Sequence, residues 1–138
     1  MIRITNVFKA DRRLWLEYCM AALNATFFHS PMWAELFEKQ SKYFVTDTRC
    51  VEFNDGLRVI IPMVKKTILP GLLNVYLSMP GSTYGGWVSP EPPGSEHIQA
   101  LKNYLLEYKN FICRENPFDK SQEILRGAES TEDITQVI

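Results

Sequence analysis

Cysteine and histidine are scarce in this 138-residue chain, which has three cysteines, Cys19, Cys50 and Cys113, and two histidines, His29 and His97. The cysteines lie far apart and form no Cys-x-x-Cys pair, so a zinc site of ordinary spacing is excluded. Each cysteine lies in an apolar periodic segment, which favours a buried free thiol. Free thiols are typical of a reducing compartment, so we predict a cytoplasmic protein without a bound metal.

The chain also lacks a dominant charge, long apolar runs and the common nucleotide-binding glycine patterns. Fifteen Lys and Arg stand against 16 Asp and Glu, a net charge of −1, which argues against a nucleic-acid clamp or a polybasic membrane binder. We see no apolar signal-peptide core and no apolar run that could span a bilayer. Neither G-x-G-x-x-G nor Gly-Lys-Ser/Thr occurs, and the Arg/Gln-x-x-Gly-x-Gly/Ala pattern that holds acetyl-CoA is missing too. We therefore expect no cofactor, no nucleic-acid partner and no membrane span.

Glycine is concentrated in one short segment, Pro80–Trp87, which holds three of the seven glycines. The segment follows the apolar run 72–79, which is typical of a strand, so the glycines are expected in a loop at the strand's end. Glycine lets other groups approach the main chain closely, and a tyrosine can stack on a ligand or hydrogen-bond to it. We predict that Tyr84, Gly85, Gly86 and Trp87 line a substrate-binding groove. The alternative is a structural turn that closes a strand onto a helix.

Hydrophobic periodicity predicts both helices and strands. The apolar run 57–64 is nearly continuous, which indicates a central strand covered by helices on both faces, with an edge, bulge or strand end at Pro62. Asn54-Asp55-Gly56 predicts a tight hairpin turn before it. The expected fold class is α/β (α+β), a mixed sheet with helices on both faces. The expected strands are 2–7, 43–53, 57–64, 72–79 and 135–138, and the expected helices begin at Asp11, Ser30 and Ser95 and end near 22, 40 and 115.

The segment Phe28–Trp33 leads into the second predicted helix. Ser30 is a favourable N-cap, and a proline suits the first helical position that follows it. His29 is a candidate substrate-binding residue, and a general base is a further option because its ordinary pKa lies near neutrality. Phe28 and Trp33 are either core residues or ligand-stacking aromatics. His97, in the first turn of the third predicted helix, is expected to be solvated, and no residue pair identifies a catalytic centre.

Several motifs together resemble the N-terminal half of FemAB-like proteins. The order strand, helix, helix, hairpin, strand, glycine-rich turn and long helix is that of an N-acetyltransferase-like (GNAT) fold. The resemblance implies one GNAT-like domain over residues 1–118. It also implies that residues 119–138 are an acidic linker and the start of a strand leading to a second domain. The motifs are Phe28-His29-Ser30-Pro31-x-Trp33, Asp55-Gly56 ahead of Ile61-Pro62-Met63, Ser78-Met79-Pro80 leading to Tyr84-Gly85-Gly86, Arg114-x-Asn116-Pro117, and Thr135-x-Val137-Ile138.

FemAB-like proteins pair two GNAT-like domains. Members transfer amino acids from aminoacyl-tRNA to the peptide of a peptidoglycan precursor, or are assigned to related acyl transfers in the cell envelope. The resemblance implies that this chain is the acceptor-side half of an acyl or aminoacyl transferase. It would be inactive alone, because the second domain usually carries much of the donor-side site. Its partners would be a peptide or sugar-linked envelope precursor and the second domain.

An interpretation from a different class stays open. The chain could be a stand-alone, non-catalytic interaction module that forms a homodimer through the strand 135–138. A reading frame that continues past Ile138 into a second such domain would favour the transferase, and a stop codon would favour the module. A complete acetyl-CoA-dependent acetyltransferase is disfavoured because the phosphate-holding loop is missing.

Overall fold

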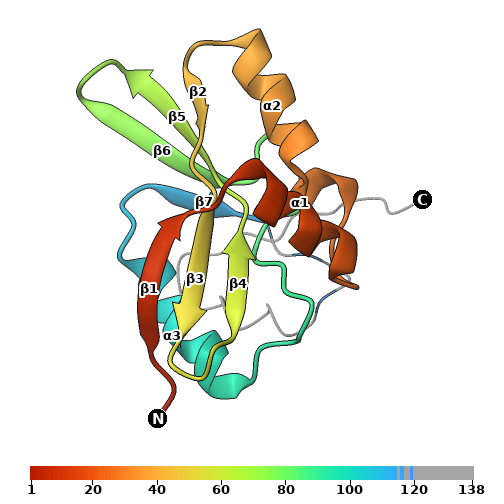
Figure 1. The fold of residues 1–138 in the computed structure, drawn as a ribbon. Coiled ribbons are helices and arrows are strands. Elements are labelled where there is room, and N and C mark those ends of the chain that lie inside the picture. The colour runs from red at the N-terminus through yellow and green to blue at the C-terminus, as the bar shows by residue number, and fades with distance from the viewer. Residues whose placement is uncertain (115, 117–118, 120–138) are drawn as a thin grey trace.

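The computed structural model describes residues 1–114, 116 and 119, and Figure 1 shows its fold. The described residues contain three α-helices, one 3-10 helix and seven strands in two sheets, so the predicted α+β class is confirmed. The helices are α1 (Arg12–Ala21), η1 (Phe27–His29), α2 (Pro31–Gln40) and α3 (Ser95–Leu106). The strands are β1 (Ile4–Lys9), β2 (Phe44–Thr46), β3 (Arg49–Phe53), β4 (Arg58–Ile61), β5 (Val64–Leu69), β6 (Leu73–Ser78) and β7 (Phe111–Cys113).

The strands form two sheets, with the orders β1-β3-β4 and β2-β5-β6-β7, where one sheet was expected. The predicted strands 43–53 and 57–64 are each divided between the two sheets. The second division falls at Pro62, since β4 ends at Ile61 and proline has no amide hydrogen for the ladder. The two places where the chain passes from one sheet to the other lie side by side, because the Asp47 amide donates to the Met63 carbonyl at 2.8 Å. Only β6 and β7 pair in parallel among the described strands, which makes the second sheet mixed.

Helices cover both faces of the three-stranded sheet, as the continuous apolar run predicted. Successive residues of a strand point to opposite faces. Cys50 and Ile60, which face each other across β3 and β4, pack in one buried cluster with Trp15 of α1. The next residue of β3, Val51, packs in the other cluster with Leu101 of α3. Burial on both faces explains why this part of the chain has so few polar residues.

The helix starts were predicted with mixed success. Asp11 caps α1, where its carboxylate accepts the Leu14 amide at 2.8 Å. Ser30 occupies the N-cap position of α2, but its hydroxyl donates to the Phe27 carbonyl at 2.6 Å and caps nothing. The expected side-chain cap is therefore wrong, because Ser30 also closes the 3-10 turn before it. That turn leaves a carbonyl within reach of the hydroxyl.

The third helix is shorter than predicted. It ends at Leu106 and not near residue 115, and Phe111–Cys113 forms β7 beside β6. Asn110 adopts a φ of +56° between them, which turns the chain out of the helical direction. The helix α3 and its flanking loops thus form the crossover that joins two parallel neighbours.

Two predictions concern residues that the structure does not describe. The strand 135–138 and almost all of the linker 119–138 lie outside the described residues, so the boundary near residue 118 and the strand-mediated dimer stay predictions. In the part of the chain that is described, no helix has the length and apolar character needed to cross a bilayer.

Candidate functional site

The glycine-rich loop 79–88 begins where β6 ends, as predicted. Because β6 and β7 run parallel, their carboxyl ends meet at the same edge of the sheet, with Ser78 beside Cys113. The Gly85 amide donates to the Arg114 carbonyl at 3.0 Å, so the loop folds back across the ends of both strands. Ligands of open sheets with parallel strands are commonly bound outside these carboxyl ends. The loop therefore occupies a position that suits a ligand site.

Ser78 holds the inner side of this loop. Its hydroxyl accepts the Gly86 amide at 2.9 Å and donates to the Pro62 carbonyl at 2.9 Å. A Cβ on Gly85 would lie 1.5 Å from the Ser78 carbonyl oxygen, so only glycine fits there. With Gly85 bonded to Arg114 and Gly86 to Ser78, both glycine amides are used inside the protein. They do not face a ligand, so a carboxylate or phosphate cannot be held by them in this structure.

His29 lies directly beneath the loop. Its Nε2 is 3.0 Å from the carbonyl oxygen of Gly85, a residue 56 positions away, and its Nδ1 is 2.9 Å from the Thr26 amide nitrogen. A carbonyl only accepts, so Nε2 carries the proton and Nδ1 accepts the amide hydrogen. The ring is therefore neutral. Trp15 donates to the His29 carbonyl at 2.6 Å, and no part of His29 is exposed.

This environment opposes a general-base role for His29. Burial lowers the pKa of the imidazole below its ordinary value because a charged ring is poorly solvated there. A proton could be accepted only at Nδ1, and that atom already accepts the Thr26 amide. His29 is thus placed to hold Gly85 and the loop in position from within.

The neutral ring predicts a pH-dependent stability. An unfolded histidine ionises near pH 6.5, whereas the folded pKa is lower, so below about pH 6.5 the unfolded state binds more protons. The contribution of His29 is fully present above that pH and is lost as the pH falls through the folded pKa. We expect the free energy of unfolding to drop by up to about 1.4 kcal/mol per pH unit in this window. Urea unfolding at several pH values, followed by tryptophan fluorescence, measures this slope.

The matched variant for this experiment is His29→Gln, which cannot ionise but keeps an amide donor. Its slope should be shallower than that of the wild-type chain over the same pH range, because residue 29 then no longer titrates. Equal slopes for the two proteins would show that His29 does not carry the pH dependence.

Tyr84 lies on the outer side of the loop, within a cluster of aromatic rings. Its ring contacts Phe28 edge to face with centroids 6.1 Å apart, and Phe28 contacts Trp33 in the same way at 5.2 Å. The Trp33 indole donates to the Pro80 carbonyl at 3.1 Å, which fixes this cluster to the loop. Phe27 adds a ring that is 56% exposed, at 6.0 Å from Trp33. We call Phe27, Phe28, Trp33 and Tyr84 the aromatic cluster.

The structure thus brings the predicted site residues together but buries most of them. Gly85, Gly86, His29 and the Trp87 side chain are buried, whereas Tyr84 is half-buried. Trp87 packs in the cluster that faces α3. A ligand at the surface could therefore touch Tyr84, with the other four residues as its support. Ligand binding at Tyr84 stays a prediction.

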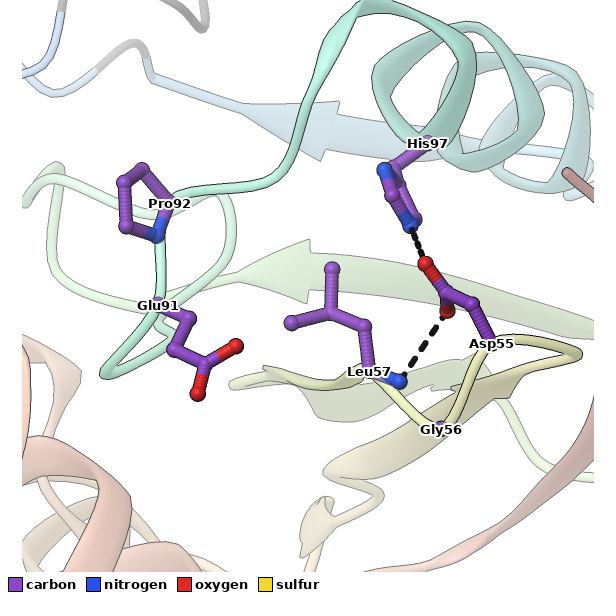
Figure 2. Close-up of a pocket in the computed structure, with 6 residues that line it drawn as sticks. All are labelled: Asp55, Gly56, Leu57, Glu91, Pro92 and His97. Carbon is purple, nitrogen blue, oxygen red and sulfur yellow. Dashed lines mark hydrogen bonds and ion pairs between the residues drawn. The ribbon is translucent and has the colours of Figure 1, made fainter.

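A separate pocket of about 370 Å³ lies between the β3–β4 turn and the start of α3. Figure 2 shows His97 and Asp55 on one side of it, and Glu91 and Pro92 on the other. A smaller cavity of about 130 Å³ shares Glu91 with it and extends to Tyr18 of α1. No local signal in the sequence pointed to this pocket, since its walls come from segments far apart in the chain.

His97 is bonded within this pocket, so its expected solvation is wrong. Its Nε2 lies 2.8 Å from Asp55 Oδ2, and its Nδ1 accepts the Gly94 amide at 3.2 Å. The ring also stands edge to face on Phe53 at 4.8 Å. Both ring nitrogens are engaged, so His97 has no free nitrogen with which to move a proton. The bond to Asp55 instead ties the start of α3 to the β3–β4 turn.

The charge of the pocket is acidic. The Leu57 amide, followed by His97, holds the pKa of Asp55 below its ordinary value, so that carboxylate is ionised at neutral pH. The Glu91 carboxylate lies across the space and has no ion-pair partner among the described residues. The described residues contain no group of three or more His, Cys, Asp or Glu that could hold a metal ion. The two carboxylates make the pocket negatively charged, which favours a cationic ligand group.

No family model, curated protein or solved structure matches this chain. The FemAB-like resemblance therefore rests on the motifs and on the order of the elements. In the structure, residues of those motifs form two features. His29 and Ser78 hold the glycine-rich loop from its buried side, and the aromatic cluster lies beside the loop.

Proposed function

We propose that this chain is the acceptor-side half of an acyl or aminoacyl transferase of the FemAB-like kind, and that it needs a second GNAT-like domain for activity. The observation that supports this most is the arrangement around the loop. Strand β6, the glycine-rich loop, α3 and the parallel strand β7 follow β1, α1, α2 and the antiparallel strands. This is the order that a GNAT-like domain would have. Three free cysteines support a cytoplasmic location for it.

The aromatic cluster is the proposed acceptor surface. Aromatic rings bind peptides and sugars by stacking, and Tyr84 and its neighbours in the cluster offer such rings at the surface. In acyl transfer to an amine, the enzyme aligns the two reactants and stabilises the developing oxyanion. The described residues offer no donor-phosphate loop and no free base beside Tyr84. In this proposal the chain binds the acceptor, and the second GNAT-like domain supplies the donor.

The test is calorimetric titration of the chain with a peptidoglycan stem peptide whose side-chain amine is free. We expect binding that weakens about tenfold in Tyr84→Ala, a loss of about 1.4 kcal/mol. Tyr43→Ala is the control, because Tyr43 is an exposed tyrosine next to β2 and outside the aromatic cluster. It should bind like the wild-type chain.

Transfer is measured in the same preparation with aminoacyl-tRNA as donor. The isolated chain should transfer no amino acid to the peptide. Transfer by this chain alone would contradict the half-enzyme proposal, and equal affinities of Tyr84→Ala and wild type would contradict the proposed acceptor surface.

A further inference from the structure

The hairpin of β5 and β6 ends in a tight apolar turn. The Leu72 amide donates to the Leu69 carbonyl at 2.9 Å, and Gly71 adopts a φ of +77°. With Pro70 before the glycine, this is the pattern of a type II turn, in which the third position requires a positive φ. Nothing lies within 4 Å of where a Cβ on Gly71 would be. Figure 1 shows the hairpin extending away from the three-stranded sheet, so its turn is a projecting point.

Four large apolar side chains surround this turn. Ile68, Leu69, Leu72 and Leu73 have 48%, 52%, 84% and 36% of their surface exposed. We call these four residues the apolar tip. Leu69 and Leu73 are directly paired across the two strands, and a register shift between Thr67 and Leu69 sets Ile68 outside the ladder. Scattered exposed leucines are ordinary, but four together on a projecting turn mark a surface that contacts something apolar.

The charges beside the apolar tip have one sign. Lys65 and Lys66 precede it on β5, and as consecutive strand residues they point to opposite faces of the hairpin. Neither forms an ion pair within the described part of the chain. Lys66 Nζ instead lies 5.4 Å from the Phe44 ring centroid. The sequence has no Asp or Glu from residue 56 to residue 90. The hairpin is therefore positively charged, although the net charge of the whole chain is −1.

We propose that the apolar tip docks on an anionic lipid surface. Its four side chains enter the boundary between headgroups and acyl chains, while Lys65 and Lys66 stay at the lipid phosphates on either side. The lysine Cα atoms lie three and four residues before Leu69, about 10–13 Å along the strand. This spacing suits the depth of about 5–10 Å that interfacial segments reach, with the flexible lysine stems spanning the rest. The inference is independent of the proposed transferase function.

A lipid surface fits these observations better than a second copy of the chain does. Cations on both faces of one hairpin, which itself carries no carboxylate, would repel the same hairpin of a second copy, whereas a sheet of phosphates attracts both lysines. The tip is also a narrow projection, which presents little area for a stable protein interface.

The experiment is flotation of the whole chain with vesicles of phosphatidylcholine alone or mixed with phosphatidylglycerol. We expect binding to the mixed vesicles only. Ile68→Asn combined with Leu72→Asn should weaken the partition at least tenfold, and Lys65→Gln or Lys66→Gln about fivefold each. Leu23→Asn replaces a leucine outside the hairpin that is even more exposed, and it should bind like the wild-type chain. All of these positions are exposed except Lys65, which is half-buried, and circular dichroism checks that each variant is folded.

Leu72→Trp gives a second measurement that does not depend on weakening the tip. Its tryptophan should be quenched by brominated acyl chains when mixed vesicles are added. The proposal is overturned if the wild-type chain does not float with mixed vesicles, or if the tip variant floats equally well. It is also overturned if Leu72→Trp emission is not quenched, or if the tip variant converts a lipid-free dimer into monomers.

Discussion

Gly85→Ala is expected to destabilise the chain by about 3–5 kcal/mol and to lower its Tm by at least about 10 °C. The added Cβ would lie 1.5 Å from the Ser78 carbonyl oxygen and 2.2 Å from the carbonyl carbon. Both atoms belong to the backbone of β6, so no change of rotamer can relieve the overlap. The loop must move, which breaks the bond between the Gly85 amide and the Arg114 carbonyl and separates Gly86 from Ser78.

The matched control is Gly71→Ala in the hairpin turn. Gly71 has a φ of +77° but open space around a Cβ, so alanine there meets only the dihedral cost of about 1 kcal/mol. Thermal and urea unfolding of the two variants separates close packing from backbone conformation. If both variants lose the same stability, the close approach of Gly85 to Ser78 is not the reason that glycine occupies the loop.

The features predicted correctly from the sequence depend on local chemistry. Asp11 starts α1 because a carboxylate satisfies an amide of the first helical turn. Pro62 ends β4 because it has no hydrogen to donate. Asp55-Gly56 forms the expected turn, with Gly56 at a φ of +92°. In each case one or two residues determine the outcome, and no distant partner is needed.

The features that sequence could not predict depend on distant partners. Phe111-Ile112-Cys113 continues the helical pattern equally well, and it becomes β7 because β6, some 35 residues earlier, offers a free edge. The division into two sheets has a similar origin. The segments 43–53 and 57–64 are each continuous in pattern, and the bond between Asp47 and Met63 where they cross becomes visible only in three dimensions.

In the candidate site, too, the residue types could be predicted from the sequence, whereas the contacts between distant residues could not. The sequence assigned the loop residues and His29 to one binding site, and in the structure His29 Nε2 lies 3.0 Å from the Gly85 carbonyl oxygen. The pattern carried no information about depth, so the burial of His29 and Trp87 was not predicted. The Asp55–His97 pair was also missed, because 42 residues separate its members and each has an ordinary local explanation.

His29→Ala is the second substitution expected to have a large effect, a loss of about 3–4 kcal/mol. The truncation leaves the Gly85 carbonyl and the Thr26 amide without their partner in a buried place, and each unsatisfied group costs about 1–3 kcal/mol. It also leaves a cavity about the size of an imidazole ring in a fully buried place, and the surroundings fill such a cavity only partly. Urea unfolding at about pH 7.5, where the ring is neutral in both states, measures the loss without a titration effect.

Two further variants separate the hydrogen bonds from the volume of the ring. His29→Asn keeps an acceptor near Nδ1 for the Thr26 amide, and we expect it to retain more stability than alanine. His29→Phe fills the space but satisfies neither neighbour, so it should be less stable than the wild-type chain by about 2 kcal/mol or more. If the phenylalanine variant is as stable as the wild type, the ring acts only as a filler. The loop is then held by Ser78 and Arg114, and the tautomer of His29 has no structural consequence.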